Sequence, residues 1–216
     1  MTTRKRSLVK RIGWRAALAL LVLGGFARQP VSAQESPRQL IEHTINQALD
    51  ILRDEKLKTQ SRERLRALRT VVDGAFDWEA MAKSSLGAPW RALDETQRTE
   101  FVSVFKELLA QRYMDDIDRF QGSEQLTVTG ADSQGELTVV KTVLLTTSRE
   151  QIPIDYTLHR RGPEWRVDDV SIEGVSLVNH YRKTFAQYLS NKTFQQLLDQ
   201  LKRKLGVRDS QTPGGH

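Results

Sequence analysis

Apolar positions recur at a helical period through the first part of residues 34–216. Residues 36–39 supply a serine N-cap, a proline at the first helical position and a capping-box glutamine. Apolar side chains then follow on one face over 41–52. The same period predicts a second helix over 65–72, a third over 77–87 and a long fourth over 94–122.

The hydrophobic period changes from 3.6 to 2 at about Gln125, which predicts strands in place of helices. Turn residues divide this part into an antiparallel meander of four strands, around 126–128, 137–145, 152–158 and 165–172. In the fourth strand Val167 and Val170 fall on opposite parities, so we predict a bulge at Asp168 and Asp169. The helical period returns after Gly174, over 177–188 and 194–205.

This order of elements predicts an α+β fold in which helices wrap a curved four-stranded antiparallel sheet. No internal repeat is visible. We expect one domain over residues 34–205 and a disordered tail over 206–216, because the tail is polar and carries glycine and proline.

Residues 1–33 predict a secretory signal peptide. A basic segment precedes an apolar run over 16–26, and Val31, Ser32 and Ala33 provide a cleavage site after Ala33. The apolar run has 11 residues, whereas spanning a bilayer takes roughly 20. We therefore expect a cleaved, soluble protein in the periplasm, with the general secretory route favoured because the arginine pair of a twin-arginine signal is missing.

Cleavage changes the meaning of the charge. The whole chain has a formal net charge of +6, which by itself would suggest nucleic acid as a partner. Seven basic and no acidic residues lie within 1–33, so residues 34–216 hold 26 Lys and Arg against 27 Asp and Glu. We therefore expect no nucleic-acid partner.

Candidate catalytic and metal chemistry is sparse. The chain has no cysteine, so it has neither a disulfide nor a lipid-modified cysteine. The four histidines lie on different expected elements, which argues against a metal site: His43, His159, His180 and His216. Ser176 follows Gly174 without the second glycine of a nucleophile elbow, so we interpret it as a helix N-cap. We expect no enzyme activity, metal or cofactor.

Two stretches of sequence resemble the MlaC family, also called the toluene-tolerance family. The first is Phe76-Asp77-Trp78-Glu79-Ala80-Met81-Ala82-Lys83, with Leu86-Gly87, Trp90-Arg91, Thr96-Gln97-Arg98, Phe101, Phe105 and Leu108-Leu109 after it. The second is Trp165-Arg166-Val167, with Asp169-Val170, Ile172 to Val178, Tyr181-Arg182 and Phe185 after it. His180 departs from the family pattern, in which asparagine often precedes the tyrosine. Together with the signal peptide, the resemblance covers essentially the whole chain.

The resemblance implies a periplasmic phospholipid shuttle that helps to maintain membrane lipid asymmetry. It implies a fold related to the nuclear-transport-factor-two-like cone, with acyl chains in an apolar cavity between sheet and helices. Its implied partners are phospholipid, an inner-membrane ring of MCE-domain subunits with its ABC transporter, and an outer-membrane lipoprotein–porin complex. A carrier of hopanoid or another polycyclic lipid is one alternative, and a structural or adaptor protein with a fully packed core and no lipid is another. An isomerase of cone-shaped fold is disfavoured, because Asp155 and Tyr156 are neighbours on one strand and so face opposite sides.

We expect the acyl chains to contact apolar residues of both the helices and the strands, and ordinary packing in the core is the competing interpretation of each. These candidate residues are Trp90, Phe105, Leu109, Val128, Val143, Ile154, Tyr156, Leu158, Val175, Leu177 and Tyr181. Arg91 and Arg182 are the candidates for neutralising a head group that stays at the mouth in water.

Overall fold

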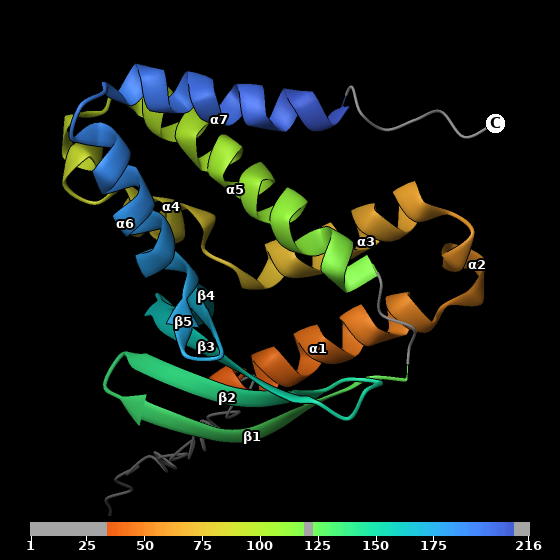
Figure 1. Cartoon of the computed structure of the whole chain (residues 1–216). Helices are drawn as coiled ribbons and strands as arrows, with labels where there is room; N and C mark the ends of the chain where they lie inside the picture. The colour runs from red at the N-terminus through yellow and green to blue at the C-terminus, as the bar shows by residue number, and fades with distance from the viewer. Residues whose placement is uncertain (1–33, 119–122, 210–216) are drawn as a thin grey trace, which may run out of the picture. The chain divides into compact units, whose positions relative to one another are not determined.

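The computed structural model describes residues 34–118 and 123–209. The expected signal peptide and residues 210–216 of the expected tail lie outside this part of the chain. Figure 1 labels the elements, in chain order: α1 (Pro37–Arg53), α2 (Glu55–Lys58), α3 (Ser61–Ala75), α4 (Trp78–Leu86), the 3₁₀ helix η1 (Ala88–Ala92), α5 (Glu95–Asp118), β1 (Gln125–Gln134), β2 (Leu137–Leu145), β3 (Gln151–Arg161), β4 (Glu164–Ile172), β5 (Val175–Ser176), α6 (Leu177–Leu189) and α7 (Phe194–Asp209). No helix among the described residues is long and apolar enough to cross a membrane.

Local capping residues set where the long helices begin. Ser36 and Gln39 form the predicted capping box of α1. At α5 the backbone N–H of Gln97 donates to Asp94 Oδ1 at 2.8 Å, and Gln97 Oε1 accepts from the Asp94 N–H at 3.1 Å. Ser176 caps α6 by accepting from the Asn179 N–H at 3.0 Å, as predicted. The sequence predicts a disordered tail from residue 206 onward. In the structure α7 continues to Asp209.

The α+β class is confirmed, but the predicted number of strands is wrong. The sheet has five antiparallel strands in the order β1-β2-β3-β4-β5. The missed strand, β5, has only two residues and is too short to show a period of two. It pairs with β4 across a two-residue turn in which Glu173 and Gly174 have φ of 50° and 78°, and tight hairpin turns favour such positive φ values.

The predicted bulge in β4 is confirmed. Val167 pairs with Leu158 and Asp169 with Thr157, so Asp168 is an extra residue in the ladder. The bulge allows Val167 and Val170 to point to the same face of the sheet.

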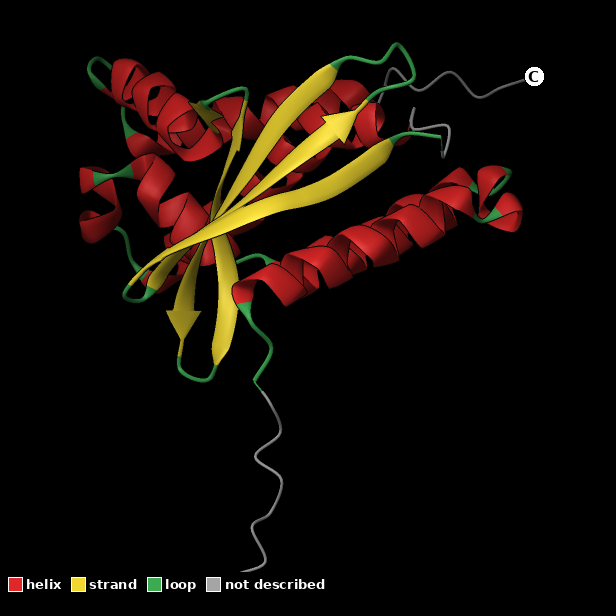
Figure 2. Cartoon of the chain, turned by 90° about the horizontal axis from the view of Figure 1, so that it is seen from below, coloured by secondary structure: helices red, strands yellow, loops and turns green. Residues whose placement is uncertain are grey.

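Helices cover one face of the sheet, which we call the inner face. Figure 2 views the molecule from the other face, so that the strands lie in front of the helices. α1 packs on it through Ile41, Ile45 and Leu49, which form an apolar cluster with residues of β2, β3 and β4: Val140, Leu158, Val167 and Val170. All seven side chains are buried. We call this group the sheet cluster.

A second apolar cluster lies among the helices α4, η1, α5, α6 and α7. Phe101, Phe105 and Phe185 are at its centre, with ring centroids 5.8 to 6.3 Å apart. We call this group the helical cluster. Phe76 contacts both clusters and is therefore one of the places where they meet.

Candidate functional site

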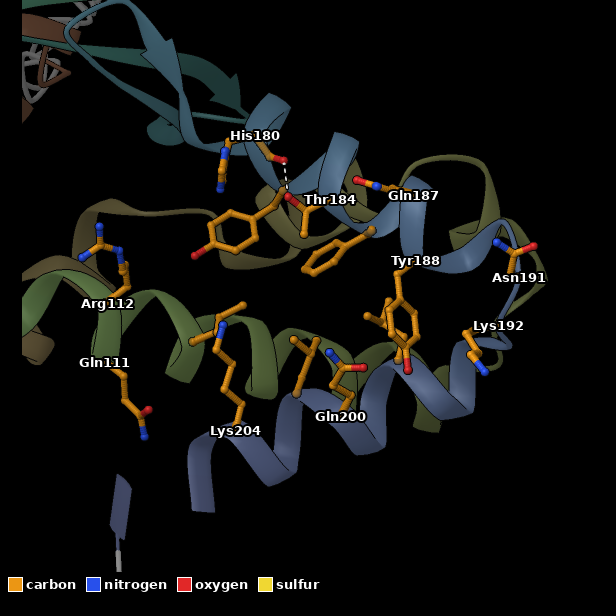
Figure 3. A pocket seen from close by; sticks show the side chains of 15 residues that line it. Gln111, Arg112, His180, Thr184, Gln187, Tyr188, Asn191, Lys192, Gln200 and Lys204 are labelled. Atoms are coloured by element: carbon orange, nitrogen blue, oxygen red, sulfur yellow. Dashed lines mark hydrogen bonds between the residues drawn. The ribbon is translucent and has the colours of Figure 1, made fainter. Parts of the chain in front are cut away.

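A pocket of about 660 Å³ lies between α5, α6 and α7 (Figure 3). Its apolar part comes from four residues of these three helices: Leu108, Phe185, Leu197 and Leu201. All four belong to the helical cluster, so the pocket has an apolar floor that is part of the packed core. Tyr181 and Tyr188 on α6 add aromatic surface.

Aromatic packing fixes the position of Tyr181 in this pocket. Its ring centroid is 5.5 Å from that of Phe105 and 5.6 Å from that of Phe185. Burial raises the pKa of Tyr181 to about 12, an effect that Tyr113 strengthens and Arg112 opposes. The Tyr181 hydroxyl therefore stays protonated at neutral pH and can donate a hydrogen bond.

The rim of the pocket is polar and basic. Arg112, Lys192 and Lys204 line it, together with amide and hydroxyl side chains. None of the residues that line the pocket is acidic. Figure 3 shows Arg112 and Lys204 toward one end and Lys192 toward the other, where α6 turns into α7. An apolar floor with a basic rim suits an amphiphile that carries an anionic group.

The inner face of the sheet provides a second apolar surface. Val140 and Leu158 are completely covered, whereas several apolar residues beside them are only partly buried: Leu126, Val128, Ile154, Tyr156, Ile172 and Leu177. Burial raises the pKa of Tyr156 to about 12, so its hydroxyl stays protonated at neutral pH. The sheet cluster thus has apolar surface that the described helices do not fully cover.

α6 joins this surface to the pocket. Its first residue, Leu177, packs against the sheet cluster, and Tyr181 lies one turn later beside the helical cluster and in the pocket wall. Four residues of a helix span roughly 6 Å, so the apolar part of the pocket and the partly covered sheet face are neighbours along α6.

The structure divides the predicted tail-contact residues into three groups. Four are buried within the clusters: Trp90, Phe105, Leu109 and Leu158. Five are partly buried at the surfaces just described: Val128, Ile154, Tyr156, Leu177 and Tyr181. Val143 and Val175 are in neither place.

The expectation that Val143 faces the interior is wrong. Val143 is adjacent on β2 to Thr142, which is buried on the inner face opposite Ile154. Because side chains alternate along a strand, Val143 points to the outer face. Val175 is 58% exposed at the hairpin turn. The apolar run on both parities of β2 concealed which valines point inward.

Neither of the two predicted head-group arginines lines the pocket. Arg182 is exposed on α6, and its Nε donates to the Ser84 carbonyl at 2.7 Å. Arg91 is exposed on η1. Sequence reasoning missed Arg112 and Lys204, which come from helices distant in sequence. The only available signal was their position on the polar side of two amphipathic helices.

A polar cluster was also missed, where α4 begins beside β3 and β4. His159 Nδ1 is 2.9 Å from Asp168 Oδ2, and His159 Nε2 is 3.3 Å from Asp77 Oδ2. Burial raises the pKa of Asp168, while His159 opposes that effect. This cluster lines no part of the pocket, and no group of three or more metal-ligating side chains converges among the described residues.

Comparison with known proteins agrees with this geometry. The profile of the family described as "MlaC protein" matches residues 42–203. The toluene tolerance protein ttg2D of Pseudomonas putida is 25% identical over 171 residues, which cover 77% of this chain and 79% of that protein. A phospholipid-binding protein from Ralstonia solanacearum, solved in complex with a phospholipid, has the same fold. Its TM-score is 0.70 at 18% identity, over 78% of this chain and 98% of the other. Since the profile covers well over half of the sequence, the chain belongs to the MlaC family.

Proposed function

We propose that this protein binds phospholipid and carries it, as a soluble protein of the periplasm, between the inner and outer membranes. The observation that carries the proposal is an apolar pocket floor beside a partly covered inner face of the sheet, two surfaces that α6 contacts one turn apart, at Tyr181 and at Leu177. The Ralstonia solanacearum protein supports it, because it shares the fold and is described as binding a phospholipid.

The physical need for such a carrier is large. At about 0.8 kcal/mol per buried CH₂, one 16-carbon chain resists transfer into water by on the order of 12 kcal/mol. A soluble protein removes this barrier by replacing water around the chain with apolar side chains. The partly buried residues Val128, Ile154 and Tyr181 are suited to that contact, because side chains already sealed in a core have no surface to offer.

The proposal includes the rest of the transport system. We infer that an MCE-domain ring with its ABC transporter at the inner membrane and a lipoprotein–porin complex at the outer membrane exchange lipid with this carrier. The family membership supports these partners. It likewise supports a sheet related to the nuclear-transport-factor-two-like cone, and a role in binding lipid without catalytic turnover.

Native mass spectrometry of the protein purified from its own periplasm tests the proposal. We expect a species heavier than the polypeptide by the mass of a phospholipid, and fragmentation that releases acyl chains and a glycerophosphate. A phosphorus assay on the extracted lipid is the control for the class of ligand. A bound polycyclic lipid without phosphorus would favour the hopanoid alternative, and a protein that never carries lipid would contradict the proposal.

A further inference from the structure

We propose that the pocket between α5, α6 and α7 selects phospholipids whose head group has a net negative charge, and that Arg112 and Lys204 hold that head group. The inference rests on the proposed lipid-binding function and adds a class of ligand and two residues to it. A phosphate diester without a compensating ammonium group, such as phosphatidylglycerol, is the chemistry that fits.

The first support is the convergence of the two cations. Arg112 comes from α5 and Lys204 from α7, nearly a hundred residues later, yet both line one pocket and lie toward the same end of it. Both side chains are on exposed residues, so the charges stay hydrated until a ligand arrives. Neither forms an ion pair with a side chain that the structure describes, a set that excludes the side chains of residues 114–118.

The Arg112 guanidinium lies over the Tyr113 ring, 5.6 Å from its centroid, so what both cations lack is a described carboxylate, and a neighbouring lysine shows that this lack is local. Lys202 lies two residues before Lys204 on α7 and pairs with Glu100 of α5. Lys204 points into a pocket whose lining includes no carboxylate. These two helices therefore pair Lys202, outside the pocket, with a carboxylate, whereas no residue that lines the pocket beside Lys204 is acidic.

The Tyr181 hydroxyl in this part of the pocket also favours an anion. The pKa of Tyr181 is about 12, so its hydroxyl is a donor at neutral pH. Gln111 and Gln200 add neutral amide groups to the same lining, and the Gln111 amide donates to the Leu205 carbonyl at 3.3 Å. A zwitterionic head group brings an ammonium that would find no carboxylate among these lining residues, whereas a phosphate finds two cations and a hydroxyl donor.

The expected preference is moderate because the cations are exposed. A Lys or Arg near an anionic lipid is worth about 1 kcal/mol at physiological salt, which is roughly fivefold in affinity. Removing both cations should therefore weaken binding of the anionic lipid by about 10- to 30-fold. Added salt should reduce the difference, because exposed charges are screened.

The test compares two double variants that change net charge equally. The first carries Arg112→Gln and Lys204→Gln. The matched control carries Arg203→Gln and Lys83→Gln, which remove one arginine and one lysine that are exposed and lie outside the pocket lining. Affinity for phosphatidylglycerol and for phosphatidylcholine with the same acyl chains is measured on delipidated protein at low and high salt. Circular dichroism confirms that each variant is folded.

We expect wild type and the control to prefer phosphatidylglycerol, and the pocket variant to lose that preference while binding phosphatidylcholine within about twofold of wild type. An equal loss of phosphatidylglycerol affinity in the pocket variant and in the control would overturn the inference, because the effect would then come from the overall charge of the protein. Equal affinity of wild type for the two lipids would overturn it as well. A wild-type protein that binds neither lipid would instead contradict the proposed function itself.

Discussion

Ile154 on β3 and Val143 on β2 are close neighbours that face opposite sides of the sheet. Ile154 pairs with Thr142, whose side chain is buried on the inner face, while Val143 pairs with Pro153. Ile154 is only partly buried. Val140, two residues before Thr142 and on the same face, is completely covered by the sheet cluster. These three apolar residues therefore occupy three different environments within one pair of strands.

Substitution by tryptophan should distinguish those environments. Extra bulk in a filled core costs about 1–3 kcal/mol, so we expect Val140→Trp to lower the free energy of unfolding by at least that much. Ile154→Trp should cost less than about 1 kcal/mol but reduce lipid retention severalfold, because the indole occupies the surface that acyl chains would contact. Val143→Trp should change neither quantity.

The measurements are denaturant midpoints on delipidated protein and phospholipid extracted per mole of purified protein. Val143→Trp is the control for adding an indole to this sheet. If Ile154→Trp destabilises the protein as much as Val140→Trp and retains normal lipid, Ile154 belongs to ordinary core.

At the scale of elements, the parts that the sequence predicts well are those with local causes. The starts of α1, α5 and α6 depend on caps three residues from their partners, and the bulge in β4 shows as a parity change within one strand. The elements that it missed are short: α2, η1 and β5 have four, five and two residues. Elements this short contain too few repeats of a 3.6- or 2-residue hydrophobic period for the period to be recognised.

Asp77 connects a helix to the sheet at one short junction. Its Oδ1 accepts from the Ala80 N–H at 2.8 Å and so caps α4. Its Oδ2 accepts from Arg161 Nε at 2.8 Å, and its backbone N–H donates to the Val167 carbonyl at 2.8 Å. The Asp77 side chain is 13% exposed, so water replaces little of what a substitution removes.

We expect Asp77→Ala to lower the free energy of unfolding by about 2–4 kcal/mol, of which about 1 is the lost cap and the rest the lost hydrogen bond from a charged donor. Asp94→Ala, at the exposed cap of α5, should cost only about 1 kcal/mol. Asp77→Asn should fall between them, because asparagine caps as well as aspartate but carries no charge. Thermal and denaturant unfolding give these free energies. Equal losses of stability for Asp77→Ala and Asp94→Ala would argue that Asp77 acts only as a helix cap and does not also connect α4 to the sheet.

At the scale of the whole molecule, the predicted class, the order of the long elements and the family emerge from periodicity and motifs, but the predicted site emerges only in part. Tyr181 lines the pocket, while Phe105 and Leu109 are sealed in the helical cluster behind it. Periodicity reports which residues avoid water and does not distinguish a packed core from a cavity wall. The basic rim depends on the crossing of α5 and α7, which no local pattern records.

Export is an expectation that rests on residues 1–33. A basic segment, a short apolar run and small residues at 31–33 should direct secretion and cleavage, so that the mature protein begins at Gln34. We expect N-terminal sequencing of the periplasmic protein to start there and the protein to remain in the supernatant after membranes are pelleted. Ala33→Asp is the control, since a charged residue at the cleavage site should cause the longer precursor to accumulate. Retention of Met1 in the wild type would contradict the expectation.

The bulge in β4 has a consequence for insertions and deletions. β2 and β3 pair without interruption, whereas Asp168 in β4 and Thr129 in β1 are extra residues in their ladders. Deleting Asp168 would leave Val167 and Val170 in normal alternation on the inner face. Deleting a residue from the middle of β3 would turn part of its apolar set toward solvent. We therefore expect this sheet to tolerate changes of length mainly in β1 and β4, which carry an extra residue, and to lose its register when β2 or β3 changes in length.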